Sequence, residues 1–416
     1  MDSDGKDLVV AEHQNREAFI PLRRTELVEL MLQDERVSQA EKIELKQMAD
    51  LLSAQFHYEH HLILDKLKAA YAPFDPDQDT VDLKAFSQDE KQKCLQDLFE
   101  EFDRLLMRAN FRKLTQKEMI ETFKIVSAWG IKMDVDLDAF ERLEVYVRGD
   151  RQTLRPIRLW KKFWKTIELS VDVYSRLVII VKFKTMPPDV ENINADDVFL
   201  KIFKDIPKAD LEMLLPGAKV KFNTFDRGKI GFPIVTGLLI TGWNIIKTSV
   251  LGLVTGGGTL MLWGVAAGTF GYGYRNYYSY NWTKTRYSLR LTRNLYYQNL
   301  DNNAGVLYRL IDEAEEQECR EAMLAYFMLW KYADTPGWTI PELDDQVEAY
   351  LEKHAGIQVD FEIDDAMIKL ERLKLVEKQA DNLYRAIPVQ QVLKTLDEAW
   401  DNHFQFNVQS AVAQQP

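Results

Sequence analysis

The chain has 416 residues, 46% of them hydrophobic, and carries a net charge of −12 at pH 7. This length is typical of two or three domains, and the apolar fraction is ample for sizeable cores. Cys94 and Cys319 lie far apart with no CxxC spacing, which excludes a disulfide framework and argues against a zinc site. The first residues show neither a secretory h-region nor an Arg-rich amphipathic pattern, so we expect no signal or transit peptide.

After an N-terminal tail over residues 1–18, residues 19–130 read as an all-helical domain. Three capping boxes predict helix starts in this range: Ser38 with Glu41, Ser87 with Glu90, and Thr115 with Glu118. The helix that begins after Ser38 is long and amphipathic. We expect it to end near Pro73, because proline cannot continue a helix.

Histidines in this first long helix form the one metal-like cluster of the sequence. His57 and His61 are four residues apart and share a helix face, with Glu59 and His60 between them. A di-metal bundle would need Glu-x-x-His motifs on further helices, and none occurs. We therefore predict no metal site, and no cofactor.

Residues 131–229 change to the alternating pattern of strands. Leu143–Arg148, Leu177–Phe183 and Val198–Phe203 predict three strands, and a short helix should follow the third. We expect a small antiparallel sheet with helical cover. This predicts a second, α+β domain.

Charged residues near the third strand are the only functional candidates that this pattern offers. They are Arg176, Lys204, Asp205, Asp210 and Glu212. As a group they would suit a charged site. Helix capping and ordinary ion pairing explain them equally well. No catalytic motif, such as Gly-x-Ser-x-Gly or a phosphate-binding loop, occurs in the chain.

Residues 230–280 form a long apolar stretch. No Asp or Glu occurs between Arg227 and Leu300. At 1.5 Å per residue, this length suffices for two membrane-spanning helices, which we expect at residues 231–254 and 259–278. Gly264 and Gly268 form a G-x-x-x-G pair suited to helix packing or to self-association of the chain. The alternative is a buried helical pair in a large soluble domain.

Basic and aromatic residues flank this stretch. We expect the following residues, in and around the juxtamembrane segment 281–304, to contact lipid headgroups: Arg275, Trp282, Lys284, Arg286, Arg290 and Arg293. A basic aromatic segment would also suit single-stranded nucleic acid, but its position beside the apolar run favours lipid. Both ends of the hairpin are basic, which predicts a bacterial cytoplasmic (inner) membrane with both termini in the cytoplasm.

Residues 305–400 read as a winged helix, followed by a tail over 401–416. Three helices precede two short strands that flank Ala380–Asn382, the predicted wing. From residue 301 onward, 23 acidic residues face 10 basic ones. Such a surface would repel phosphate, which argues against nucleic acid and favours a protein partner docking on this acidic domain.

Several segments together resemble the transmembrane protein 143 family, a family of unknown function in bacteria, plants and animals. They are Tyr71–Pro76, Tyr174–Arg176 and Phe203–Pro216. The resemblance extends over most of residues 15–400 and implies a membrane protein that is mitochondrial in animals. The absent transit peptide departs from the organellar members and favours a bacterial source. No catalytic residue can be transferred from this family.

The sequence therefore predicts an α+β membrane protein with four parts: an N-terminal helical domain, a small antiparallel β-containing domain, a transmembrane helical hairpin and a C-terminal winged-helix-like domain. The expected function is that of a membrane-anchored scaffold or adaptor without enzymatic activity. Two alternatives stay open: an enzyme acting on lipid or another membrane substrate, and a small channel or transporter of oligomerised hairpins.

Overall fold

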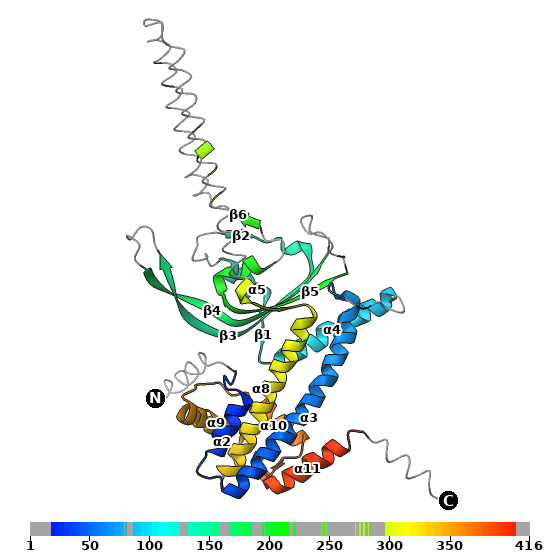
Figure 1. Ribbon diagram of the computed structural model, residues 1–416, viewed down its shortest axis with the longest axis vertical. Coiled ribbons are helices and arrows are strands. Elements are labelled where there is room, and N and C mark those ends of the chain that lie inside the picture. The colour runs from blue at the N-terminus through cyan, green and yellow to red at the C-terminus, as the bar shows by residue number, and fades with distance from the viewer. Residues whose placement is uncertain are drawn as a thin grey trace, which may run out of the picture.

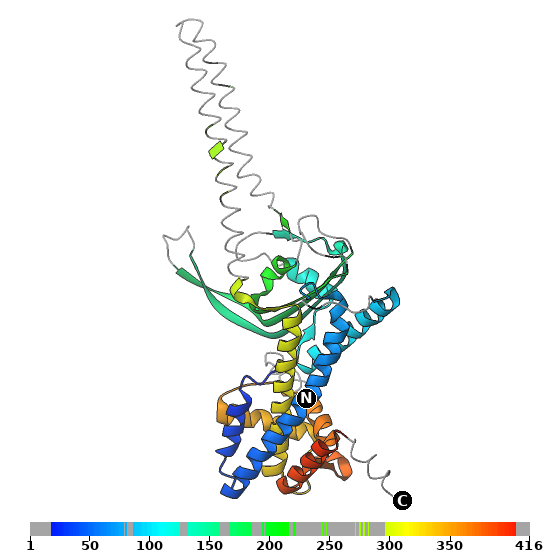
Figure 2. The same cartoon turned by 45° about the vertical axis from the view of Figure 1, so that its right-hand side comes forward.

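The computed structural model describes residues 18–78, 80, 86–124, 132–158, 166–184, 194, 196–215, 219–221 and 296–404, and the single positions 243, 247, 271, 274, 275, 278 and 282. In this part of the chain, a twisted antiparallel sheet lies at one end of a helical module (Figure 1). Two long helices, α3 and α8, run side by side from the sheet through this module (Figure 2).

The sheet has five strands in the order β1-β3-β4-β5-β7. They are β1 (Arg112–Lys113), β3 (Phe140–Arg158), β4 (Thr166–Phe183), β5 (Val198–Pro207) and β7 (Asn299–Asn302). Two separate two-stranded pairs are β2 (Lys132–Asp134) with β6 (Lys219–Lys221), and β8 (Val376–Lys378) with β9 (Tyr384–Ala386). The three strands predicted from alternation thus exist as β3, β4 and β5, and β7 adds an edge strand from a distant part of the sequence.

The helices of the first part of the chain are α2 (Arg24–Leu32), α3 (Gln39–Tyr71), α4 (Gln88–Arg108) and α5 (Gln116–Lys124). Those of the last part are α8 (Ala304–Lys331), α9 (Ile340–Ala355), α10 (Ile363–Arg372) and α11 (Val389–Asp401). Short 3₁₀ turns are η1 (Ala72–Phe74), η2 (Leu137–Ala139), η4 (Lys208–Leu214) and η5 (Ala380–Asn382).

Both faces of the central strands are buried. On one face, Tyr146, Val178 and Leu200 share a core with residues of α3, α4 and α8. On the other face, Ile179 and Phe203 share a core with residues of α5 and η4. Side chains alternate along a strand, so Val178 and Ile180 of β4 and Leu200 and Ile202 of β5 face α8, whereas Tyr174 and Ile206 belong to the core on the other face. This alternation decides which charged residues of the sheet meet the helix.

Capping boxes begin the helices as the sequence predicts. Ser38 accepts a hydrogen bond from the Glu41 amide, and the carboxylate of Glu41 accepts one from the Ser38 amide. The same reciprocal pattern begins α4 at Ser87 and α9 at Thr339. Each box satisfies amides that have no partner inside the helix.

Replacing Ser87 with alanine should lower the free energy of unfolding by about 1 kcal/mol, because the Glu90 amide loses its acceptor. Urea denaturation would measure this loss, with Gln88→Ala as the control at an exposed neighbouring position. An equal stability of the two variants would show that the Ser87 cap contributes nothing.

Helix α8 starts at Ala304, well before the first helix expected for the winged helix at residue 318. Its first turns bury Val306 and Leu310 under the sheet, although its middle carries many acidic residues. Three helices, α8 to α10, then precede the β8–β9 hairpin, with the expected wing residues Ala380–Asn382 forming the turn. The three helices and the hairpin predicted for residues 305–400 are thus present, and the first helix extends to the sheet; the winged-helix fold itself stays a prediction.

The N-terminal and C-terminal helices share one hydrophobic core. Leu45 and Leu52 of α3 belong to the same buried cluster as Phe327 of α8, Leu351 of α9 and Leu370 of α10. Helix α11 also packs along α3. Two segments that the sequence analysis treats as separate domains therefore contribute to a single helical module.

The membrane-protein class and the transmembrane character predicted from the sequence are wrong for the residues that the structure describes. Among these, no helix has both the length and the apolar composition needed to cross a membrane. The longest helices, α3 and α8, are long enough but carry charged residues along most of their turns, which a bilayer interior does not accommodate. Apart from single positions, the expected spans 231–254 and 259–278 lie outside the described residues.

Candidate functional site

Two of the predicted functional residues lie side by side in the sheet, together with a third cation that the sequence analysis missed. Arg176 of β4 pairs in register with Lys204 of β5 on one side and with Arg148 of β3 on the other. Arg148 and Arg176 both reach Glu313 of α8, whereas Lys204 is exposed. Like charges directly opposite one another are destabilising in a sheet, so this row needs anionic partners.

The acidic candidates lie elsewhere. Asp205 has a φ of 53° and accepts a hydrogen bond from Arg151, away from Arg176. Asp210 and Glu212 are half-buried in η4, which covers the opposite face of the sheet. The structure thus separates the five candidates: Arg176 reaches α8, Lys204 is its exposed neighbour in the sheet, and the three acids lie elsewhere.

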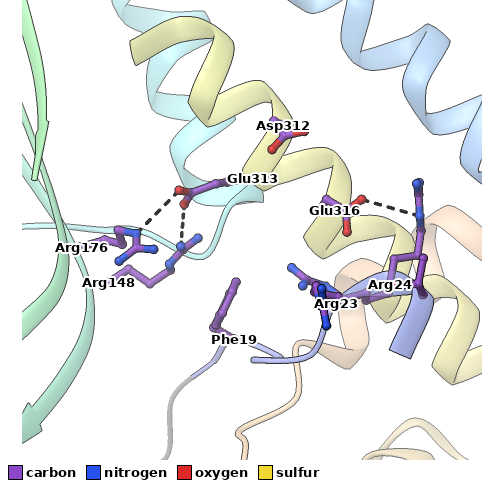
Figure 3. Close-up of a pocket in the computed structure, with 10 residues that line it drawn as sticks. Phe19, Arg23, Arg24, Arg148, Arg176, Asp312, Glu313 and Glu316 are labelled. Atoms are coloured by element: carbon purple, nitrogen blue, oxygen red, sulfur yellow. Dashed lines mark hydrogen bonds and ion pairs between the residues drawn. The ribbon is translucent and has the colours of Figure 1, made fainter. Parts of the chain in front are cut away.

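A cavity of about 440 Å³ lies between the sheet, α8 and the segment before α2. We call it the arginine cavity. Its lining residues are Phe19, Arg23, Arg24, Thr25, Arg148, Arg176, Asp312, Glu313, Glu316 and Arg320. Figure 3 shows Arg148 and Arg176 reaching Glu313 from the sheet, with Phe19 below them and Asp312 and Glu316 further along α8. Three segments that are remote in sequence meet here.

Arg148 is the most enclosed group of the row. Its side chain is 7% exposed, and its guanidinium donates to Glu313 at 2.6 Å and to the Ala109 carbonyl at 2.9 Å. The rings of Phe19 and Phe111 cover its faces at 4.3 and 4.6 Å. Burial lowers the pKa of Arg148, Glu313 opposes that change, and repulsion from Arg176 adds to it. Arg148 remains a cation, but one that is repelled by the neighbouring charge of Arg176.

The single carboxylate of Glu313 lies close to three guanidinium groups. Glu313 is 2.6 Å from Arg148, 3.3 Å from Arg309 and 3.7 Å from Arg176. The Nε atoms of Arg176 and Arg309 are buried and have no hydrogen-bond partner among the residues that the structure describes. Positive charge therefore exceeds negative charge around Glu313.

Arg320 brings a further cation to the cavity from α8. It is 6% exposed, donates to the Leu22 carbonyl and lies under the ring of Phe19 at 5.2 Å. Burial lowers the pKa of Arg320, whereas Glu316 and Glu321 raise it. The Nε of Arg320 also has no hydrogen-bond partner in the described part of the chain. In all, five arginines and three acidic residues line the arginine cavity.

Behind the cavity, α8 carries a second set of buried charges, which we call the Glu318 network. It consists of Glu318 and Glu321 of α8, Arg108 of α4, Lys369 of α10 and His60 of α3. Glu318 is fully buried and accepts two hydrogen bonds from Arg108. The Lys369 Nζ lies 3.5 Å from Glu318 and 3.6 Å from Glu321. This network joins four helices from both ends of the chain.

The three histidines considered for a metal point to separate partners. His60 is fully buried and its Nδ1 donates to the Phe56 carbonyl at 2.8 Å, so Nε2 carries the lone pair in the neutral ring. Burial lowers the pKa of His60. His57 contacts Glu315, and His61 contacts Asp65. In the part of the chain that the structure describes, no group of three or more His, Cys, Asp or Glu could hold a metal ion.

The helix-packing and lipid-contact residues predicted from the sequence fall mostly outside the described residues. Arg275 and Trp282 are described as exposed helical positions. The others are undescribed: Gly264, Gly268, Lys284, Arg286, Arg290 and Arg293.

Two signals in the sequence point to the arginine cavity, but only weakly. Arg148 ends an alternating run in which Tyr146 faces the same side, so an arginine on a buried face could have been noticed. The closely spaced charged residues in 309–321 are typical of a solvent-exposed helix, because the sheet that covers them is formed by residues distant in the sequence. No feature of the sequence around Phe19 indicates that this residue lines a cavity.

Guanidinium groups bind anions well but do not act as general acids or bases at neutral pH. Among the described residues that line the arginine cavity, there is no nucleophile beside a base, and the only hydroxyl is that of Thr25. Its chemistry is therefore that of recognition: planar, permanently charged donors around a space larger than a single oxyanion.

The comparisons with known proteins leave the activity open. A family model described as "Protein of unknown function (DUF3754)" matches residues 173–305, from β4 to the first residues of α8. This segment includes Arg176 and Lys204. No solved structure matches the chain. The resemblance to the transmembrane protein 143 family stays a prediction.

Proposed function

We propose that this protein binds a small molecule bearing an oxyanion, such as a phosphate, sulfate or carboxylate group, in the arginine cavity. The observation that carries the proposal is the shared carboxylate of Glu313, which faces three guanidinium groups. An oxyanion would accept the hydrogen bonds that the Nε atoms of Arg176 and Arg320 lack. It would also relieve the repulsion along the cationic row.

The size of the cavity indicates that the oxyanion belongs to a larger molecule. A volume of about 440 Å³ lies within the range of small-molecule sites in proteins. The ring of Phe19 and the aliphatic stems of the arginines offer apolar surface to an organic body. The carboxylates Asp312 and Glu316 would disfavour further negative charge at their end of the cavity.

Isothermal titration with sodium sulfate tests this proposal, at constant ionic strength maintained with sodium chloride. We expect sulfate to bind, and Arg176→Gln to weaken binding about tenfold or more, because a charge-assisted hydrogen bond contributes about 1.5–3 kcal/mol. Sulfate and inorganic phosphate should compete with each other.

Arg151→Gln is the matched control for this experiment. Arg151 is also an arginine of the sheet, but it is half-exposed and pairs with Asp205 outside the cavity. Its replacement should leave sulfate binding unchanged. An equal loss in both variants, or no sulfate binding by the unmodified protein, would overturn the proposal.

The adaptor function expected from the sequence stays a prediction for the acidic C-terminal helices. In support of it, α10 exposes Ile368, with 64% of its surface accessible, between the exposed acids Asp364 and Glu371. The three positions are spaced along one helix face. An apolar side chain flanked by acids suits a partner with an apolar and basic surface.

A further inference from the structure

A chain of buried hydrogen bonds connects the arginine cavity to the Glu318 network. Arg320 lines the cavity and donates through Nη2 to the Gln317 Oε1 at 3.2 Å. The Gln317 Nε2 donates in turn to the Glu321 Oε1 at 2.7 Å. Gln317 and Glu321 are each 1% exposed. The Gln317 amide thus accepts on the cavity side and donates on the network side.

Asn110 links Glu321 to the segment that forms one wall of the cavity. Asn110 donates from Nδ2 both to Glu321 at 3.2 Å and to the carbonyl of Ala18, next to Phe19. On its other side, Glu321 faces Lys369 of α10 at 3.6 Å, and the Lys369 Nζ has no hydrogen-bond partner. Glu321 therefore lies between the anion site and the C-terminal helices.

We infer that Glu321 takes up a proton when an oxyanion binds in the arginine cavity, so that the affinity of the site is controlled by the protonation of this one buried carboxyl group. This inference rests on the proposed oxyanion binding. Its physical basis is charge: a neutral Glu321 leaves Arg320 with less competing negative charge, and the cavity then attracts an anion more strongly. By linkage, the bound anion favours the protonated form of Glu321 to the same extent.

The charged neighbours of Glu321 allow this change near neutral pH. They are Glu318 and Arg320 on α8 and Lys369 on α10, and Glu318 in turn faces Arg108 of α4 and His60 of α3. Burial raises the pKa of Glu321 to about 7, against the attraction of Lys369, which lowers it. Burial lowers the pKa of His60 below its ordinary value, away from that of Glu321.

Sulfate is the appropriate probe because it keeps its double negative charge from pH 5.5 to 8.5, whereas phosphate titrates in that interval. Isothermal titration should be carried out across this range in two buffers of different ionisation enthalpy, which counts the protons exchanged on binding. We expect sulfate affinity to fall by about fivefold or more as pH rises through 7, with net proton uptake near pH 7.

Glu321→Gln imitates the protonated carboxyl group and should bind sulfate with the affinity of the low-pH form at every pH, without proton exchange. Glu371→Gln, at an exposed position of α10, is the matched control and should keep the full pH dependence. The proton count on the unmodified protein needs no variant, so it remains decisive if Glu321→Gln does not fold.

The outcomes separate the two proposals. Sulfate binding that is independent of pH and exchanges no proton would overturn the role of Glu321 and leave the oxyanion site intact. A pH dependence that persists in Glu321→Gln would also overturn it. No sulfate binding at any pH would overturn the oxyanion site, and the inference with it.

Discussion

Replacing Glu318 with glutamine is expected to destabilise the protein by about 3 to 5 kcal/mol, which is the effect of removing one partner from a buried ion pair. Glu318 is fully buried, and Arg108 donates two hydrogen bonds to it. Burial alone would raise the pKa of Glu318, but Arg108 and Lys369 hold it below its ordinary value. Without the charge of Glu318, Glu321 would be the only carboxylate of the Glu318 network to balance the cations Arg108 and Lys369.

Urea denaturation at pH 7.5 would measure this loss as a change in the free energy of unfolding. Glu371→Gln changes the same residue type at an exposed position of α10 and should shift stability by less than about 0.5 kcal/mol. A loss of less than 1 kcal/mol in Glu318→Gln would show that the charges of the network do not depend on one another. Apolar packing alone would then hold together the four helices α3, α4, α8 and α10.

Replacing Glu321 with glutamine should have the opposite effect on stability at alkaline pH. The pKa of Glu321 is raised from 4.5 to about 7 in the folded chain, so the folded state binds the proton more tightly than the unfolded state. The resulting stabilisation is fully present below about pH 4.5 and is lost as pH rises through 7. Glutamine does not ionise, and the variant avoids this loss.

At pH 8, Glu321→Gln should therefore be more stable than the unmodified protein by up to about 3 kcal/mol, from 1.36 kcal/mol for each unit of pKa difference. At pH 4.5 the two proteins should have equal stability. Thermal and urea denaturation from pH 4.5 to 8.5 would trace the difference. A variant that is less stable at pH 8 would show that the ionised carboxylate is needed by Lys369.

These two glutamates lie three residues apart on α8 and respond to burial in opposite ways. Glu318 is paired bidentately with an arginine, which stabilises the ionised form. Glu321 receives hydrogen bonds from two neutral amides, those of Gln317 and Asn110, and has Lys369 only at 3.6 Å. Environment alone thus separates the behaviour of two identical side chains.

Local patterns in the sequence predicted most of the elements. The capping boxes at Ser38, Ser87 and Thr115 correctly marked helix starts, because the hydrogen bonds of a cap close within four residues. Alternation correctly identified the strands that became β3, β4 and β5. Leu375 to Ile387 was correctly interpreted as a hairpin, whose turn contains Asp381 and Asn382 with positive φ.

The site required information that no local pattern contains. Arg176 and Lys204 were singled out from the sequence, but Asp205, Asp210 and Glu212 were grouped with them only because they are close in the chain. The positive φ of Asp205 and the turn of η4 place these acids away from Arg176. Proximity along the chain is a poor guide where a strand ends and the backbone reverses.

By itself, the sequence determined the periods, caps and turns from which the helices and strands follow, because these depend on hydrogen bonds and steric limits within a few residues. Its long apolar stretch led to a membrane class that the described helices do not support. Only the tertiary structure decided that α8 crosses the sheet, which brings Glu313 and Arg320 to Arg148, Arg176 and Phe19. The physical reason is that charge acts through space: a surplus of arginines around one carboxylate exists only after remote segments have packed together.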